Sequence, residues 1–390
     1  MKGFRTAVCG SSLALAAVAT HAAEAELDER VTEVEQVRAG VHPGGGGFFI
    51  ETDELRLRVL GYVQAQTDLQ DSRLERDASR DFHVRRARIN FLVDLYDDFE
   101  FFMELDGAPE GRTALVEARL NWRLRDDALQ LRAGKFTSQF STENARSSRS
   151  IDTIERHLAL NSMFLLPALD TQFGVMLHGR AGSDEGWSYS LGVYNGNSSA
   201  NENVRDDNNS KELQAKITRQ WDPHWSTSLA VNYSREEEQE LALVDTGFNS
   251  FVAVDVEGVR RGLGGDVHWE RGPWSVRAEG LFFRFDTPEG DDADLAGGFI
   301  QTTRFIDGDE HGGTQALLRL ETSRLNGETG EHGDAIHALT AGVNWFLNPN
   351  VRVQVNGIAY RFNGTSPQDQ QNLEQAHTLY TAMGQLQYKF

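Results

Sequence analysis

The stretch Val116-Glu117-Ala118-Arg119-Leu120-Asn121-Trp122-Arg123-Leu124-Arg125 alternates apolar and polar residues at every position. An α-helix would spread the apolar residues around its circumference, whereas a β-strand keeps them on one face. The stretch therefore predicts a strand with one apolar face and one face rich in arginine.

The same alternation recurs from residue 55 to the end of the chain. Most of these segments run to about ten residues or more, which is longer than the usual strand of about five or six. We predict sixteen strands, at residues 55–66, 82–95, 98–107, 113–125, 128–136, 171–182, 186–195, 210–220, 224–234, 263–271, 273–285, 297–305, 314–324, 335–347, 350–362 and 378–390.

The connections between these strands alternate between tight turns, such as Asn348-Pro349-Asn350, and long polar loops. Bacterial outer-membrane barrels show the same asymmetry between short periplasmic turns and longer external loops. The connection at 306–313 is longer than this scheme expects for a turn. The long connections are residues 67–81, 137–170, 196–209, 235–262, 286–296 and 363–377.

A soluble β-sandwich is the alternative to a membrane barrel. Strands of about ten residues suit a tilted crossing of a bilayer, and aromatic residues near strand ends suit an interfacial girdle. In lipid every backbone polar group must be paired, so a spanning sheet has to close on itself. We therefore predict an all-β fold, a transmembrane antiparallel β-barrel of sixteen strands. The aromatic residues in question are Trp122, Trp187, Tyr189, Trp225, Trp345, Tyr360, Tyr380 and Tyr388.

The first 47 residues divide into two parts. Lys2 and Arg5 precede a short apolar run and the small residues Ala22 and Ala23, a pattern typical of a secretory signal peptide. We assign residues 1–23 to the signal peptide, 24–47 to a polar extension that ends in a glycine linker, and 48–390 to the barrel. This division predicts an exported protein in the outer membrane of a Gram-negative bacterium.

Composition excludes several classes of protein. The net charge of −21 argues against a nucleic-acid partner, which a basic surface would attract. The single cysteine, Cys9, lies inside the predicted signal peptide and can form neither an internal disulfide nor a thiolate-rich metal site. We predict no cofactor and no metal.

The predicted number of strands implies a water-filled channel, since eight strands fill their interior whereas sixteen leave a lumen. The longest connection, residues 137–170, contains the apolar stretch Met163-Phe164-Leu165-Leu166-Pro167. A loop that is only solvated would not need these residues. We predict that it folds into the barrel and narrows the channel.

The polar strand faces carry many basic residues, and a ring of such residues selects anions in a pore. About half of the arginines are expected to pair with carboxylates such as Glu104, Asp106 and Glu117. The acids in the loops are expected to be solvated, with contacts to lipopolysaccharide and other anionic lipid through divalent cations as the alternative. The candidate pathway residues are Arg56, Arg58, Arg86, Arg88, Arg119, Arg123 and Arg132 on strands, Lys135 at the start of the inserted loop, and Arg146, Arg149 and Arg156 within it.

Several short segments along the chain carry a resemblance to a known family through their order and spacing. The segments are His83-Val84-Arg85-Arg86-Ala87-Arg88-Ile89, Val116-Glu117-Ala118, Leu131-Arg132-Ala133-Gly134-Lys135-Phe136, Phe140-Ser141-Thr142-Glu143, Ile154-Glu155-Arg156, Gly342-Val343-Asn344-Trp345-Phe346, Asn348-Pro349-Asn350 and Leu386-Gln387-Tyr388-Lys389-Phe390. They resemble the phosphate-selective porin O and P family. The resemblance implies a trimeric, sixteen-stranded, anion-preferring outer-membrane porin, whose terminal Phe390 is similar to the signal read by the outer-membrane assembly machinery.

The residues that bind phosphate in the family carry over only in part. Arg156 resembles the constriction arginine, and the adjacent Arg85 and Arg86 resemble the arginine pair on the second strand. Three positions depart: Asn144 stands in place of a lysine, Val116 in place of an aspartate and Tyr62 in place of an arginine. A missing ammonium removes a point charge that a dehydrated phosphate needs. We therefore expect a porin for small anionic solutes, phosphate among them, without strict phosphate selectivity.

Three other functions fit a membrane barrel: a non-selective porin, a barrel enzyme, and a structural or adhesive barrel without conductance. The enzyme would need a nucleophile and a base. His178 and His268 face inward by strand parity, but no serine stands in a recognisable nucleophile motif. A porin remains the prediction.

Overall fold

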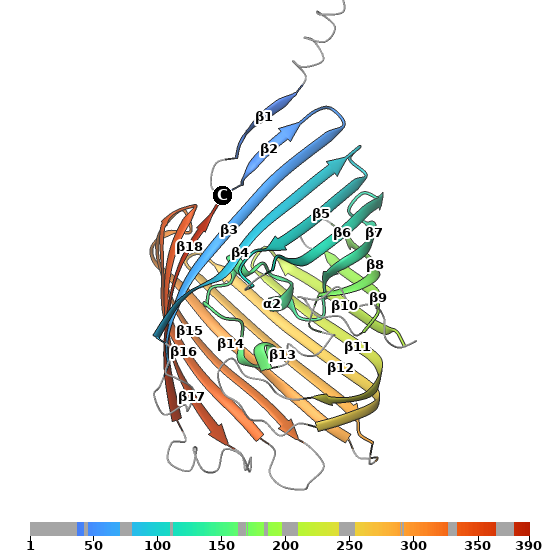
Figure 1. Ribbon diagram of the computed structural model, residues 1–390, viewed down its shortest axis with the longest axis vertical. Coiled ribbons are helices and arrows are strands. Elements are labelled where there is room, and N and C mark those ends of the chain that lie inside the picture. The colour runs from blue at the N-terminus through green and yellow to red at the C-terminus, as the bar shows by residue number, and fades with distance from the viewer. Residues whose placement is uncertain are drawn as a thin grey trace, which may run out of the picture.

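The computed structural model describes residues 37–42, 46–70, 80–109, 112–162, 169, 171–182, 186–196, 210–241, 254–288, 290, 292–326, 334–363 and 378–390. Sixteen antiparallel strands form a closed barrel (Figure 1), which confirms the predicted fold class. The strands are β3 (Leu55–Gln70), β4 (Arg80–Leu95), β5 (Phe99–Asp106), β6 (Ala114–Arg125), β7 (Leu129–Thr137), β8 (Thr171–Ala181), β9 (Trp187–Tyr194), β10 (Glu212–Asp222), β11 (Trp225–Leu241), β12 (Val254–Arg271), β13 (Trp274–Asp286), β14 (Asp292–Asp309), β15 (Gly312–Asn326), β16 (Asp334–Asn348), β17 (Val351–Asn363) and β18 (Thr378–Lys389).

The barrel closes where β18 pairs with β3. Their register runs from Thr381 opposite Gln70 to Lys389 opposite Tyr62. Beyond it, Gly61 and Phe390 exchange two backbone hydrogen bonds, of 3.2 and 3.0 Å. The last residue of the chain therefore completes the seam, and the sheet has no open edge in the barrel wall.

A hairpin precedes the barrel at the end where the C-terminus lies (Figure 1). Strand β1 (Arg38–Val41) pairs with β2 (Phe48–Glu51), and β2 continues the sheet beside the first residues of β3. Strand β1 falls within the residues that we assigned to the polar extension. The predicted signal peptide lies outside the described residues.

Several connections are shorter than predicted, and two of them are flanked by register shifts. Residues 235–262 were expected to be a loop, but β11 continues to Leu241 and β12 begins at Val254. Their register shifts between Glu236 and Gln239, so a single period of two does not describe the pair. The connection at 306–313 is a tight hairpin between β14 and β15, with a register shift at Phe305 and a positive φ at Gly308. A bulge of this kind interrupts the alternation of apolar and polar residues, so a search for strict alternation misses part of the strand.

The two faces of the wall have opposite polarity. Outward residues such as Leu120 and Trp122 are exposed, whereas inward residues such as Gln64, Asn121 and Gln354 are buried and polar. This is the reverse of a soluble core and matches a lipid-facing exterior around a polar lumen. No helix among the described residues is long and apolar enough to cross a membrane.

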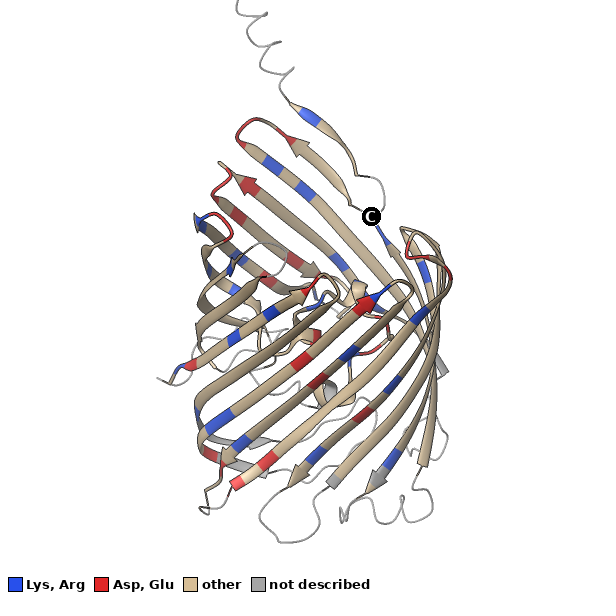
Figure 2. Ribbon diagram, turned by 180° about the vertical axis from the view of Figure 1, so that it is seen from behind, with Lys and Arg blue, Asp and Glu red and all other residues tan. Residues whose placement is uncertain are grey.

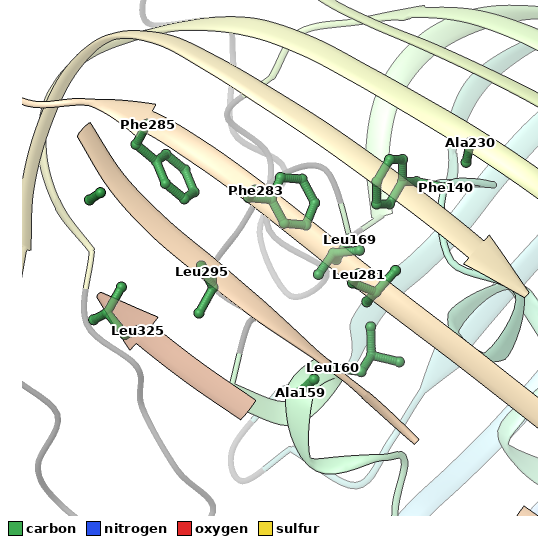
Figure 3. Close-up of a cluster of buried hydrophobic side chains, with 11 residues drawn as sticks. Phe140, Ala159, Leu160, Leu169, Ala230, Leu281, Phe283, Phe285, Leu295 and Leu325 are labelled. Atoms are coloured by element: carbon green, nitrogen blue, oxygen red, sulfur yellow. The ribbon is translucent and has the colours of Figure 1, made fainter. Parts of the chain in front are cut away.

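The segment between β7 and β8 enters the barrel, as predicted, and is called the inserted loop below. It contains helix α2 (Thr142–Ala145), the 3₁₀-helix η1 (Ser148–Ser150) and helix α3 (Leu158–Ser162). Apolar side chains of this loop, among them Phe140 and Leu160, pack against Leu281, Phe283 and other inward residues of β11 and β13–β15 (Figure 3). The apolar stretch at residues 163–167 lies outside the described residues, but the buried Leu160 and Leu169 flank it.

The backbones of β13 and β14 lie close together at Gly298, and this contact allows a test of how tightly the barrel wall is packed. Gly298 pairs with Gly280. A Cβ at Gly298 would lie 2.1 Å from the carbonyl oxygen of Glu279, whereas a Cβ at Gly280 would meet nothing within 4 Å. We expect Gly298→Ala to destabilise the barrel by about 1–3 kcal/mol through overpacking, with Gly280→Ala as the matched control. The urea midpoint of each variant in lipid vesicles measures the difference, and equal midpoints would contradict it.

Candidate functional site

A β-bulge aims two adjacent arginines into the lumen. The register between β3 and β4 pairs Gln64 with Arg86 and Ala65 with Val84, which leaves Arg85 as the extra residue. Strict alternation would direct Arg85 outward. With the bulge, Arg85 contacts Glu155 of the inserted loop at 2.8 and 3.1 Å, and Arg86 approaches the same carboxylate at 4.0 Å.

Most of the predicted pathway arginines have carboxylate partners, several of them on neighbouring strands. Arg88 donates to Glu104 and Asp106 at 2.6 and 2.8 Å, and Arg119 donates to Glu100 at 2.9 Å. Figure 2 shows basic and acidic segments near one another on the strands of the wall. The expected partnership with Glu104, Asp106 and Glu117 is thus present. The other pairs are Arg56 with Glu51, Arg58 with Asp94, Arg119 with Glu117, Arg123 with Asp94 and Glu100, and Arg146 with Asp152.

Three predicted residues have other surroundings. Arg132 lies over the ring of Phe136 and, among the described residues, forms no ion pair. Arg149 lines the larger of the two cavities described below. Lys135 belongs to β7 and not to the inserted loop; it is 1% exposed, and its ammonium donates to the carbonyl of Leu115. A solute in the lumen cannot reach Lys135.

The barrel wall anchors the N-terminus of α2. Glu279 on β13 accepts hydrogen bonds from the backbone N–H groups of Thr142 and Glu143 at 2.7 and 3.2 Å, and from the hydroxyl of Ser141 at 3.1 Å. A carboxylate at this position satisfies backbone donors that have no partner within the helix.

Two arginines of the second half of the barrel hold the rest of the inserted loop. Arg319 on β15 donates to Glu143 at 3.2 Å, and both side chains are almost fully buried. Arg352 on β17 donates to the carbonyl of Ile151 at 3.0 Å. Neither arginine was among the predicted site residues. Their inward parity was visible in the sequence, but their partners are more than 170 residues away.

Arg156 joins different parts of the inserted loop. Its guanidinium donates to the hydroxyl of Ser148 at 3.0 Å and to the carbonyls of Asn144 and Arg146 at 3.2 and 2.8 Å. It therefore shapes the loop from within, whatever contact it makes with a solute.

The three departures from the family pattern leave the lumen without the expected charges. The Asn144 side chain is buried and donates to the carbonyl of Leu169. Val116 is the extra residue of a bulge between β5 and β6 and is 6% exposed. Tyr62 is fully buried, and its hydroxyl finds no hydrogen-bond partner among the residues that the structure describes.

The loop carboxylates are held in their charged form. Burial alone would raise the pKa of Glu155, but Arg85 and Arg86 outweigh it and lower the pKa to about 2. Burial also opposes ionisation of Asp152, whose pKa is lowered by Arg146 and Arg277. Ionised acids and arginines thus tie the loop to the wall at neutral pH.

Two large cavities lie between the inserted loop and the wall in the part of the chain that the structure describes. The larger, of about 610 Å³, is lined by Arg146, Arg149 and Asp152 of the loop and by residues of the short turns, such as Pro273 and Asn350. The smaller, of about 370 Å³, lies between α2 and the wall of β7–β13. Its cations are Arg132, Arg180, Lys216 and Arg277, and its only carboxylate among the described residues is Asp266.

The two histidines of the enzyme alternative also line the smaller cavity. His178 is hydrogen-bonded through Nε2 to the side-chain oxygen of Asn121 at 2.6 Å, and not to a serine. His268 lies 3.5 Å from Glu270. Ser190 and Ser226 stand opposite these histidines in the sheet, but among the described residues no hydrogen bond joins either serine to its histidine, so the nucleophile–base contact that the alternative requires is not seen there.

The sequence family described as "phosphate-selective porin O and P" matches residues 60–390 of the chain. No curated protein matches the chain in sequence. Among solved structures, OmpT of Vibrio cholerae in its trimer form matches with a TM-score of 0.62, 10% identity, and coverage of 87% of this chain and 100% of that one. An anion-selective porin from Comamonas acidovorans matches with a TM-score of 0.59, 11% identity, and coverage of 86% and 100%. At such identities the structural likeness shows the fold alone.

Removal of the buried arginine on β15 tests the anchoring of the loop. In Arg319→Met the buried carboxylate of Glu143 loses its arginine partner and keeps the backbone N–H of His157, and loss of the charged partner of a buried ion pair typically costs about 3–5 kcal/mol. We expect larger and noisier single-channel conductance in planar bilayers, because the loop leaves the wall. Arg324→Met, an exposed position on the same strand, serves as the control. Equal noise in the two variants would contradict the anchoring role.

Acid tests the contact between Glu155 and Arg85. Because the pKa of docked Glu155 lies below its ordinary value of 4.5, this contact stabilises the loop fully above about pH 4.5 and is lost as the pH falls through about 2. Conductance noise of the wild-type channel should therefore rise between about pH 4 and 2. Glu155→Gln, which cannot titrate, should be noisier already at pH 7 and should lack this acid step. An identical acid profile in both channels would refute the assignment.

Proposed function

Since the chain belongs to the phosphate-selective porin O and P family, and is an outer-membrane channel for small solutes in a Gram-negative bacterium, we propose that it conducts anions in preference to cations. The proposal excludes strict selectivity for phosphate.

One observation carries the anion preference. In the smaller cavity four cationic side chains, Arg132, Arg180, Lys216 and Arg277, face one carboxylate, Asp266. Elsewhere in the lumen most arginines are paired, so they contribute little net field. An excess of cations along a water-filled path raises the local concentration of anions.

The buried surroundings of three residues argue against strict phosphate selectivity. Asn144, Val116 and Tyr62 place no cation or carboxylate in the lumen where family members place charged groups. Arg146 of the inserted loop, a nearby cation, is engaged by Asp152 at 3.6 Å. Without dedicated partners, a dehydrated phosphate has no advantage over other small anions.

A homotrimer is the assembly that we propose. Strands β5 and β9 have 8 residues each, against 18 in β12 and β14. Eight residues tilted by about 45° span roughly 19 Å, less than the apolar band of about 25 Å. A second copy of the chain, packed against the short strands β5 and β9, would shield this part of the wall from lipid. OmpT of Vibrio cholerae, which shares the fold, is described in a trimer form.

We keep the remaining partners as proposals. Phe390 directly follows β18 at the closure seam, a position compatible with recognition by the outer-membrane assembly machinery. Lipid and lipopolysaccharide would surround the exposed apolar face. The signal peptide at residues 1–23 would direct export.

Reversal potentials in a salt gradient test the proposed function. With potassium chloride at unequal concentrations across a planar bilayer, we expect a reversal potential of the sign that marks chloride as the more permeant ion. The preference should weaken as salt rises, since screening shortens to about 3 Å at 1 M. A reversal potential near zero would indicate the non-selective porin instead. A reversal potential of the opposite sign, which marks cation preference, would contradict the proposal.

A further inference from the structure

The smaller cavity is more than a widening of the channel, and we call it the serine-lined chamber. Its wall is a strip of hydroxyl side chains on the inward face of β9–β11, which includes Ser188, Ser190, Thr218, Ser226 and Ser228. The inserted loop covers it with Gln139, Thr142 and Ala145. Charged residues border the strip on both sides.

Strand register places these groups next to one another. Arg180 on β8 pairs with Ser188, which pairs with Thr218 on β10. Thr218 pairs with Ser228 on β11, and Ser228 with Asp266 on β12. Directly opposed side chains in a sheet lie about 5 Å apart. The chamber therefore presents one continuous row of hydroxyls between a guanidinium and a carboxylate.

Several hydroxyls of the strip are free to bind a ligand. Thr218 and Ser228 are bonded to each other at 3.0 Å. The hydroxyls of Ser188, Ser190 and Ser226 make no hydrogen bond to any described residue of the protein.

The cations of the chamber differ in how far they are already neutralised. Lys216 lies 3.4 Å from Asp266 and also contacts Thr142, so the protein itself occupies it. Among the described residues, the ion-pair partner of Arg277 is Asp152, at the long distance of 4.0 Å. Arg132 forms no ion pair within the described part of the chain. The Nε atoms of Arg132 and Arg277 are buried and have no hydrogen-bond partner in the described structure.

The volume of the chamber indicates the size of its ligand. About 370 Å³ falls at the lower end of the range of small-molecule sites, roughly 300–1,000 Å³. An inorganic ion would leave most of this space to water and the serines unused. A small organic molecule fills more of it, and the lining offers such a molecule both arginines and hydroxyls.

We propose that the serine-lined chamber binds a small hydroxylated organic anion with two or more negative charges. Arg132 and Arg277 hold its anionic groups, and Ser188 and Ser190 bond its hydroxyls. This inference rests on the proposed anion channel and adds a binding site within it. While the ligand is bound there, it blocks the ion current.

Block of the chloride current by four probes tests the proposal in the wild-type channel. Citrate and tricarballylate carry the same three carboxylates, but only citrate has a hydroxyl. We expect citrate to halve the chloride current at a concentration about threefold to tenfold lower than tricarballylate does. One or two neutral hydrogen bonds increase affinity by about this factor. Glucose 6-phosphate should block better than inorganic phosphate for the same reason. The two pairs also reveal whether carboxylate or phosphate is the preferred anionic group.

Substitutions then locate the site. Arg132→Gln and Arg277→Gln should each raise the half-block concentration of citrate about tenfold or more, as expected for a lost charged hydrogen bond. The double variant Ser188→Ala with Ser190→Ala should remove the difference between citrate and tricarballylate. Arg304→Gln is the matched control, since it removes the same charge from the exposed residue over Trp274. It should leave the block unchanged.

The outcomes separate the two proposals. Anion preference with equal block by citrate and tricarballylate would overturn the chamber site and leave the proposed function intact. Cation preference would overturn the proposed function itself. If the arginine variants do not raise the half-block concentration, although their heat-modifiable mobility shows folded barrels, the chamber is not the binding site.

Discussion

Closure of the sheet, β18 onto β3, is the constraint on which the rest of the structure depends. In the hydrocarbon of a bilayer an unpaired backbone N–H or C=O costs several kcal/mol, so sixteen spanning strands are tolerable only as a ring. The exchange of hydrogen bonds between Gly61 and Phe390 completes that ring at the end of the chain. Every other feature, including the polarity of both faces, follows from a closed wall with lipid outside and water inside.

A wide wet lumen creates a second problem, because a loop that enters it has no apolar core to hold it. The chain solves this in two ways. The inward side chains of Leu281 and Phe283 form a local apolar surface on which Phe140 and Leu160 pack (Figure 3). Elsewhere the loop is tied by buried charged groups, above all Arg319 with Glu143. Such pairs add little net stability compared with apolar packing, but they are strongly directional. They fix where the loop lies, and thereby the shape of both cavities.

The sequence alone was enough to predict the strands, their number and the inward loop, because alternation is a local property of neighbouring residues. It was not enough where geometry breaks the period. The bulge at Arg85 reverses the side that parity assigns to it, and the bulges at Glu236 and Phe305 hid strand residues within predicted connections. Resemblance, and not parity, was what singled out Arg85.

Contacts between residues far apart in the sequence could not be predicted from it for a different reason. Arg319 and Arg352 are inward by parity, yet their role comes from Glu143 and Ile151 on a loop that any of several walls could have received. Lys135 shows the opposite error, because a basic residue in a family-like segment is buried against Leu115 and Phe173 instead of facing the lumen. A residue type indicates a charge, but only the packing around it decides whether a solute meets that charge.

The same distinction governs the relation between net charge and selectivity. A chain of charge −21 would seem to repel anions, yet charges act over about 8–10 Å at moderate ionic strength. Acids such as Asp294, paired with Arg284 on the exposed side of β13 and β14, lie outside the lumen and are screened by solvent. Inside, paired arginines cancel against Glu100, Glu104 and their neighbours. An ion in the channel responds to the charge that is left after this pairing, and in the serine-lined chamber that charge is positive because four cations line it with one carboxylate, Asp266, among the described residues.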